Sequence, residues 1–103
     1  MNQPLPLELT ALAVRQVQDA EDWWRKNRQA APNAVRDELE RAFALISLRP
    51  SAGSRASDLE LADVRRVFLA KIKYQLYYRV LPNPKRVQVV ALWHARRGKG
   101  PPL

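Results

Sequence analysis

The chain contains no cysteine and only three glycines among its 103 residues. The absence of cysteine excludes disulfides, thiolate nucleophiles and cysteine-based metal sites, so the fold does not depend on the redox state of its compartment. Aromatic residues are also few, with three Trp, three Tyr and two Phe. We therefore expect a core built mostly from Leu, Val and Ala.

Long apolar runs are missing as well. A membrane-spanning helix needs about 18 apolar residues in succession, and the sequence has no such stretch. The first residues also lack the basic and apolar regions of a signal peptide. Because the length matches the commonest size of one domain, we expect a single domain over residues 1–103, located in the cytoplasm and without a membrane segment.

Acidic residues are absent from the last forty positions, residues 64–103, which carry ten Lys or Arg. The first sixty-three residues carry eight basic and ten acidic residues, so the net charge of +8 arises in the C-terminal part. A surface that only had to stay hydrated would mix both signs, because uncompensated like charges weaken the fold. The asymmetry indicates binding to a polyanion or to an acidic protein.

The first half of the chain has the pattern of a short strand followed by two helices. Residues 5–9 alternate between Leu and other types, which is typical of a strand with one buried face. Apolar residues at helical spacing predict a helix over 11–28 and a second over 32–48. Pro32 is suited to the first position of the second helix, and Pro50 ends it.

The second half has the pattern of three strands. Residues 64–69 are rich in β-forming types, and residues 72–80 and 87–94 alternate with period two. In the last strand, one face would carry Val87, Val89, Ala91 and Trp93. Residues 51–63 show no period, and we expect a loop with a helical turn near 59–61.

The order strand, helix, helix, strand, strand, strand predicts an α+β domain. Two helices with a short link pack as an antiparallel hairpin, here over residues 11–48. We expect this hairpin to cover one face of a small twisted, mainly antiparallel sheet. The first strand would then lie beside the C-terminal meander.

Several local features accompany this order. They are a first strand that runs into a helix over 7–13, a Pro-started second helix closing at Arg49 and Pro50, the following Gly53, and strands at 64–67, 74–80 and 87–94 that lead into Arg96 and Arg97. The ordered combination, from about residue 5 to residue 97, resembles the ParE/RelE superfamily of bacterial type II toxins, in particular its ParE-like "plasmid stabilisation" branch.

The resemblance implies one of two activities, because a fold does not choose between them. In the ParE branch, the toxin inhibits DNA gyrase by binding. In the RelE branch, it is a ribosome-dependent endoribonuclease in which basic residues and a terminal tyrosine or histidine cleave mRNA. An antitoxin that wraps the toxin silences both. A third interpretation is a basic binding module without toxicity.

RNA cleavage requires a proton acceptor, a proton donor and cations that stabilise the phosphorane. If the chain is RelE-like, the expected catalytic residues are His94, Arg65, Arg79 and Arg97. The RelE-like site usually carries a tyrosine or an acid–base pair at the end of the sheet, and after His94 this chain has neither tyrosine nor carboxylate. The catalytic set is therefore incomplete.

His94 is the single histidine of the chain. We interpret it as a strand-end side chain hydrogen-bonded to a loop, as an acid–base group, or as a contact to a partner. No Cys, Asp or Glu stands near it at ligand spacing, so we expect no metal site, and we expect no cofactor.

Contact with the target or the antitoxin is expected at seven residues: Trp23, Arg65, Arg66, Tyr77, Arg79, Arg96 and Arg97. Trp23 falls just outside the apolar stripe of the first helix. Tyr77 and Arg79 fall on the polar face of their strand, opposite Tyr74 and Tyr78. We expect that face to be exposed as a contact surface or to be a solvated face covered by helix termini.

From the resemblance and the missing terminal tyrosine we predict a ParE-like toxin that inhibits DNA gyrase by binding. A ParD-like antitoxin would neutralise it and form a hetero-oligomer with it. Antitoxins of this kind are typically acidic, so the basic C-terminal surface serves either the antitoxin or the target.

Overall fold

The computed structural model describes residues 3–96 and 100–103. Its elements are β1 (Leu7–Leu9), α1 (Ala11–Asn27), α2 (Ala34–Leu48), β2 (Ser54–Arg55), β3 (Arg65–Leu69), β4 (Tyr74–Leu81) and β5 (Arg86–His94). The strands form one sheet in the order β1-β5-β4-β3-β2. β1 is parallel to β5, and the other neighbouring strands are antiparallel.

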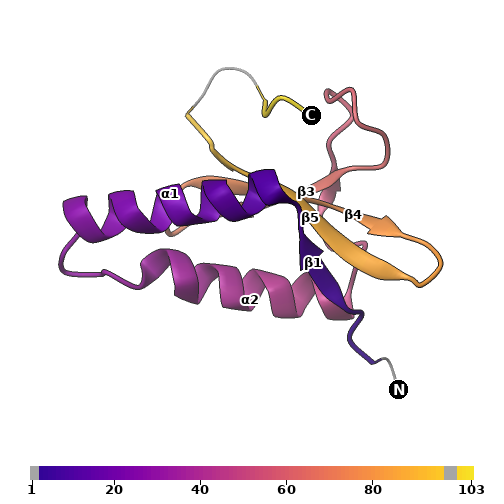
Figure 1. Cartoon of the computed structure of the whole chain (residues 1–103), viewed down its shortest axis with the longest axis horizontal. Coiled ribbons are helices and arrows are strands. Elements are labelled where there is room, and N and C mark those ends of the chain that lie inside the picture. Colours follow the sequence, from indigo (N-terminus) through magenta and orange to yellow (C-terminus); the bar gives the residue numbers. More distant parts are fainter. Residues whose placement is uncertain (1–2, 97–99) are drawn as a thin grey trace.

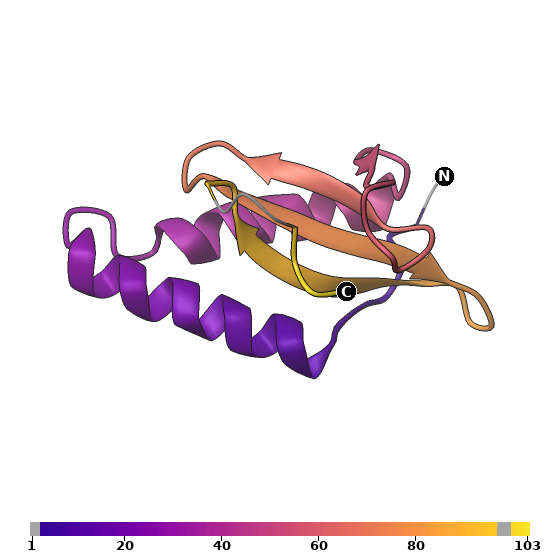
Figure 2. The ribbon, with the colours of Figure 1, turned by 90° about the horizontal axis from the view of Figure 1, so that it is seen from above.

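The two helices run antiparallel to each other and cover one face of the sheet (Figures 1 and 2). Fourteen buried residues form the core between these layers: Ala13, Ala20, Ala34, Val35, Leu39, Ala42, Ile46, Leu69, Ile72, Leu76, Tyr78, Val87, Val89 and Leu92. The predicted α+β architecture, with a helical hairpin on a mainly antiparallel sheet, is confirmed. Short side chains dominate the helix side, which allows the helices to lie close to the strands.

α1 begins and is positioned by two side-chain hydrogen bonds. The Thr10 hydroxyl accepts a hydrogen bond of 3.1 Å from the backbone N–H of Ala13, which caps the helix start. Two turns further, the amide oxygen of Gln16 accepts a hydrogen bond of 2.9 Å from the backbone N–H of Leu92. This bond joins α1 directly to β5.

α2 begins two residues later than predicted. The structure places Pro32 in a turn in which the Ala34 N–H donates to the Ala31 carbonyl, and Asn33 is the residue before the helix. Asp37 lies in the first turn of α2, where its negative charge complements the helix dipole.

A β-bulge in β5 changes which side chains face the helices. Tyr77 pairs with Ala91 and Tyr78 with Val89, so Val90 is an extra residue in β5. Val90 and Ala91 pack on the sheet face that is turned away from the helices, whereas Leu92 returns to the helix-facing core. The unbroken alternation predicted for 87–94 is therefore wrong beyond the bulge.

The second face of the sheet carries a small core of its own. Its buried residues are Ala56, Val64, Tyr77, Val90 and Ala91, and Leu59, Leu61, Trp93 and Leu103 pack against them. The residues after β2 form turns and bends from 57 to 63, without the helical turn that we predicted, and they cover this face. Tyr77 is only 3% exposed as a result, so its predicted exposure is wrong.

Two further boundaries differ from the prediction. β2 was not predicted, because two residues are too few to show a period, and its ladder to Arg65 and Arg66 defines it. β4 begins at Tyr74 rather than residue 72, because Lys73 adopts a φ of 64° in the turn after β3. Within the described residues, no helix is long and apolar enough to cross a membrane.

Candidate functional site

The structure places Arg65 and Arg79 in one groove and Trp23, His94 and Arg96 in another, at opposite ends of β4, whereas Arg66 and Tyr77 line neither. The first, which we call the arginine groove, has a volume of about 550 Å³ and includes Arg55, Arg65, Arg79, Glu60 and Asp63 in its lining. The second, the aromatic groove, has a volume of about 570 Å³ and is lined by Trp23, Trp24, Arg28, Ile72, Lys73, Tyr74, His94 and Arg96. Both volumes fall in the range of about 300–1,000 Å³ that is usual for ligand sites.

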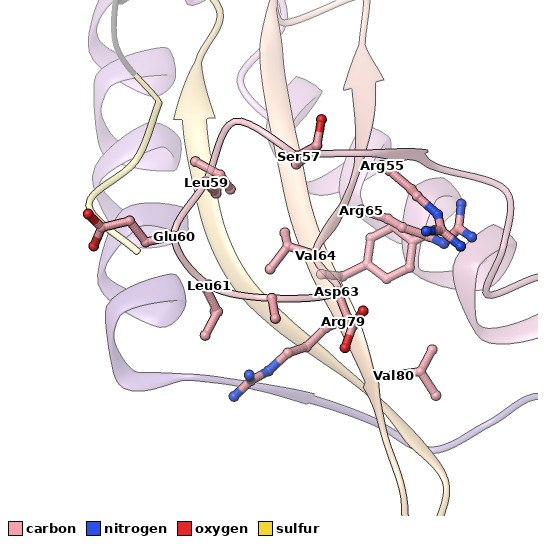
Figure 3. Close-up of a pocket in the computed structure, with 13 residues that line it drawn as sticks. Arg55, Ser57, Leu59, Glu60, Leu61, Asp63, Val64, Arg65, Arg79 and Val80 are labelled. Carbon is pink, nitrogen blue, oxygen red and sulfur yellow. The ribbon is translucent and has the colours of Figure 1, made fainter.

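Arg65 is fixed at one wall of the arginine groove by the segment that follows α2. Its Nη1 donates a hydrogen bond of 2.7 Å to the Gly53 carbonyl. Arg65 lies directly opposite Tyr78 in the antiparallel ladder, so both side chains are on the same face of the sheet. Figure 3 shows the Arg55 and Arg65 side chains extending to the same side of the groove. Two cations are thus brought together there.

Tyr78 connects this wall to the core. Burial raises the pKa of its phenol, while the hydrogen bond from Gly53 and the charge of Arg65 act in the opposite direction. The side chain is fully buried and lies within the helix-facing core. Tyr78 is therefore a neutral positioning residue at physiological pH.

Arg79 points away from Arg65 (Figure 3). It follows Tyr78 in the strand and so projects to the other face, where its Nε donates a hydrogen bond of 2.9 Å to the amide oxygen of Gln88. Gln88 in turn donates to Glu8, whose carboxylate also forms a 2.5 Å ion pair with Arg86. The guanidinium of Arg79 thus belongs to a polar network that extends across β4, β5 and β1.

Arg66 also lies on the face turned away from the helices. It pairs with Tyr77 in the ladder, and its Nη1 is 3.4 Å from a carboxylate oxygen of Asp58. Asp58 is more than half exposed, so this pair contributes little to stability. Arg66 therefore retains a side chain that a partner can reach.

Trp23 is the most accessible aromatic ring of the aromatic groove. It is 47% exposed, as its place outside the apolar stripe predicted. The guanidinium carbon of Arg28 lies 5.6 Å from its ring centroid, a cation–π distance, and the Trp24 ring packs edge-on at 5.9 Å. The buried Trp24 Nε1 finds no hydrogen-bond partner among the described residues.

His94 closes the aromatic groove at the end of β5. It pairs with Tyr74 across the ladder, and the two rings pack edge-to-face with centroids 5.0 Å apart. Its Nδ1 accepts a hydrogen bond of 3.1 Å from the Arg96 N–H, which assigns the proton of the neutral ring to Nε2. The Ala95 N–H also donates to the Lys73 carbonyl, which joins β5 to the turn before β4.

The residues expected for RelE-like catalysis do not converge in the described structure. His94 pairs with Tyr74 and Arg79 with Gln88, so the two are separated by five residues along β4, or about 17 Å. Arg65 lies beside Tyr78, four positions from the His94 pair. Arg97 lies outside the described residues. No group of three or more metal-ligating side chains occurs among the described residues.

Sequence reasoning missed several residues of the two grooves. Arg55 was hidden in a segment without a period, although its place between Gly53 and the basic β3 was a signal. Arg28 follows the end of α1, and Lys73 lies in the turn between β3 and β4. Lys73 reaches the groove of Trp23 only through tertiary packing, which no local pattern could have found, whereas Arg28 follows Trp23 at the end of the same helix and helical spacing was a signal for it.

Comparison with known proteins gives a match over most of the chain. The family model "ParE toxin of type II toxin-antitoxin system, parDE" matches residues 7–98. No curated protein sequence matches significantly.

Solved structures of toxins share the fold. The chromosomal ParDE system from P. aeruginosa is similar, with a TM-score of 0.71 and 21% identity, over 89% of this chain and 97% of that chain. An E. coli RelE mutant in the free state has a TM-score of 0.60 and 17% identity, over 93% and 88%. The intact E. coli RelBE toxin–antitoxin complex has a TM-score of 0.53 and 22% identity, over 90% and 99%.

Because their sequence identities are low, the solved structures establish only that the fold is shared. The family model, which matches residues 7–98, establishes the family. The confirmed order of elements over the same residues agrees with both. The chain therefore belongs to the family of ParE toxins of type II toxin–antitoxin systems.

Proposed function

We propose that the chain inhibits DNA gyrase by binding to it, and that a ParD-like antitoxin neutralises it in the cytoplasm. The observation that carries the preference for binding over catalysis is the separation of His94 from Arg65 and Arg79 along the sheet. An acid–base reaction requires donor and acceptor within hydrogen-bond reach of one reacting group. The backbone positions of His94 and Arg79 are about 17 Å apart along the sheet, which is too far for both side chains to act on one scissile bond.

The hydrogen bonds of the arginines also favour binding. Arg65 is engaged with the Gly53 carbonyl and Arg79 with Gln88. Both guanidinium groups retain further N–H donors, since each has five. Such anchored cations present fixed positive charge to a protein or nucleoprotein surface and need no movement during the encounter.

The antitoxin is proposed to dock on the helical hairpin and the adjoining sheet. Five large apolar side chains are exposed on these elements: Val14, Trp23, Leu45, Leu48 and Phe68. Exposed apolar groups of this kind suit an amphipathic partner helix, and acidic residues of the partner would meet Arg65, Arg66, Arg79, Arg96 or Arg97. Two of the similar solved structures, ParDE and RelBE, are toxin–antitoxin systems by name.

Induced expression without antitoxin tests the proposal. We expect growth arrest, a reporter plasmid that loses negative supercoils, and intact mRNA. The matched control is coexpression of the ParD-like antitoxin, which should restore growth and plasmid topology. Unimpaired growth would instead support the third interpretation, a basic module without toxicity.

A second candidate function is RelE-like cleavage of mRNA on the ribosome. The observation that favours it is the convergence of Arg55 and Arg65 at one side of the arginine groove (Figure 3), whose lining also includes Tyr78. Two cations at one point would stabilise a phosphorane. Ribosome-dependent cuts in mRNA, together with unchanged plasmid supercoiling, would support this candidate and contradict gyrase inhibition.

A further inference from the structure

The aromatic groove differs from the arginine groove in its charge. The arginine groove includes the carboxylates of Glu60 and Asp63 among its lining residues. The described lining of the aromatic groove contains three cationic residues, Arg28, Lys73 and Arg96, and no carboxylate. A groove with uncompensated positive charge attracts an anion, and no acidic residue of its lining competes for the cations.

The aromatic groove also presents an open ring. Trp23 keeps 47% of its surface exposed even though Arg28 lies against it and Trp24 packs at its edge. An accessible indole beside a groove offers a flat apolar surface on which a ligand can pack. The flat group that best fits an exposed indole flanked by a guanidinium is another aromatic ring.

Backbone hydrogen bonds also fix the positions of the three cationic residues of the aromatic groove. The Lys73 carbonyl accepts from the Ala95 N–H, and the Arg96 N–H donates to His94. The backbone of two of the three cationic residues is thereby fixed at the ends of β4 and β5. The third, Arg28, is the C-cap residue of α1, and its N–H donates to the Trp24 carbonyl at 2.7 Å. The ligand therefore meets cations whose backbone positions are already set.

We propose that the aromatic groove binds single-stranded nucleic acid, with a base stacked on Trp23 and backbone phosphates bound by Arg28, Lys73 and Arg96. A ring with an accessible face beside a positively charged groove is the combination that single-stranded nucleic acids recognise. A peptide of acidic residues alone, such as polyglutamate, would satisfy the cations but has no flat ring to pack on Trp23. This activity goes beyond the proposed inhibition of gyrase and does not require gyrase.

Fluorescence anisotropy of a labelled single-stranded oligothymidine, titrated with the purified chain, tests this inference. Each phosphate contact with a single strand contributes about −0.7 to the slope of log K against log salt, so three contacts predict a slope of about −2. Replacing Arg28, Lys73 or Arg96 by Gln should each reduce the slope by about 0.7. The Trp23→Ala variant should bind about tenfold more weakly with an unchanged slope, because it removes stacking but no charge.

Matched controls lie on the same molecule. Arg25→Gln removes a cation from the same helix end that is paired with Asp22 and does not line the groove. Phe68→Ala removes an exposed aromatic ring, 48% exposed, at a different site. Both should retain the affinity and the slope of the unmodified chain, and circular dichroism should show that all variants are folded.

Three outcomes would overturn the inference. The first is equal affinity for a polyglutamate peptide with no effect of Trp23→Ala, which would indicate an acidic peptide as the ligand. The second is tighter binding to a duplex than to a single strand of equal length, which excludes stacking on an open base. The third is a salt slope that changes in Arg55→Gln but in none of the groove variants. A negative result in the gyrase assay alters none of these readouts.

Discussion

The hydroxyl of Tyr78 joins the middle of the sheet to the segment that follows α2. It accepts a hydrogen bond of 2.9 Å from the Gly53 N–H and donates one of 2.7 Å to the Pro50 carbonyl. A Cβ at position 53 would lie 2.8 Å from this hydroxyl and 2.8 Å from the Arg66 carbonyl, so only glycine fits there. The contact therefore determines where β2 begins and where the Gly53 carbonyl meets Arg65.

We predict that Tyr78→Phe destabilises the fold by about 1–3 kcal/mol, because it leaves a buried N–H and a carbonyl without their partner. Urea unfolding followed by circular dichroism measures this as a lower midpoint. Tyr77→Phe is the matched control, since the Tyr77 hydroxyl has no hydrogen bond to the described residues, and we expect a change within about 0.5 kcal/mol. Equal stability of the two variants would contradict the role given to Tyr78.

The Glu8 carboxylate makes stability depend on pH. The hydrogen bond from Arg86 lowers the pKa of Glu8 below its ordinary value of 4.5, aided by the Arg86 charge and by Gln88. The folded state therefore binds fewer protons than the unfolded state, and the stabilisation is present above pH 4.5 and lost as pH falls through the folded-state pKa.

The Glu8→Gln variant should thus be less stable than the unmodified chain near neutral pH and equally stable well below pH 4.5. Glu40→Gln is the control, because Glu40 is exposed and no ion pair to it occurs among the described residues. It should not reproduce the loss of stability that Glu8→Gln shows near neutral pH. A Glu8→Gln difference that persists in acid would show that the effect comes from packing and not from charge.

Charge reversal at Arg96 and Arg97 should slow association with the ParD-like antitoxin and flatten the salt dependence of the on-rate. Rim charges act mainly on encounter, and exposed ion pairs contribute only about 0–1 kcal/mol each, so dissociation should change less. Surface plasmon resonance at several salt concentrations measures both rates. Lys85→Glu, an exposed cation in the turn between β4 and β5 and outside the helical hairpin, provides a control for a change in net charge. An unchanged on-rate and salt slope would assign these arginines to the target of the toxin.

His94 should be dispensable for toxicity. Its Nδ1 is occupied by the Arg96 N–H and its ring is packed against Tyr74, and no carboxylate lines the aromatic groove beside it. We expect His94→Gln to retain activity within about tenfold, whereas loss of an acid–base group costs about 10²–10⁴. Growth assays at matched expression levels decide between these results. A thousandfold loss in a folded variant would contradict inhibition by binding alone.

The order and type of the elements could be predicted from the sequence, since periods of 3.6 and 2 are distinct over residues 11–48 and 74–80. The β-bulge in β5 could not be predicted. Val89 and Val90 are both β-branched and apolar, so either fits a buried face, and only pairing with Tyr77 and Tyr78 shows which residue is extra. One added residue exchanges the two faces beyond it and places Trp93 away from the helices.

The burial of Tyr77 and the composition of the aromatic groove could not be predicted for a different reason. Both depend on segments that are distant in the sequence. Leu59 and Leu61 cover Tyr77 from a loop without a period, and Lys73 approaches Trp23 only after the sheet and α1 have packed. Trp23 could be found because a helix converts spacing directly into faces. Loops and turns offer no such rule, so the approach of Lys73 and Arg96 to the groove of Trp23 was not predictable.

The most direct test of the account is DNA supercoiling by purified gyrase, titrated with the purified chain in the absence of ribosomes. Inhibition by binding predicts that supercoiling activity falls as the chain approaches the concentration of gyrase, that His94→Gln inhibits equally, and that adding antitoxin restores activity. Gyrase that works at its full rate with an excess of folded chain would contradict the central claim. Ribosome-dependent cleavage of mRNA by the same preparation would then establish the RelE-like alternative.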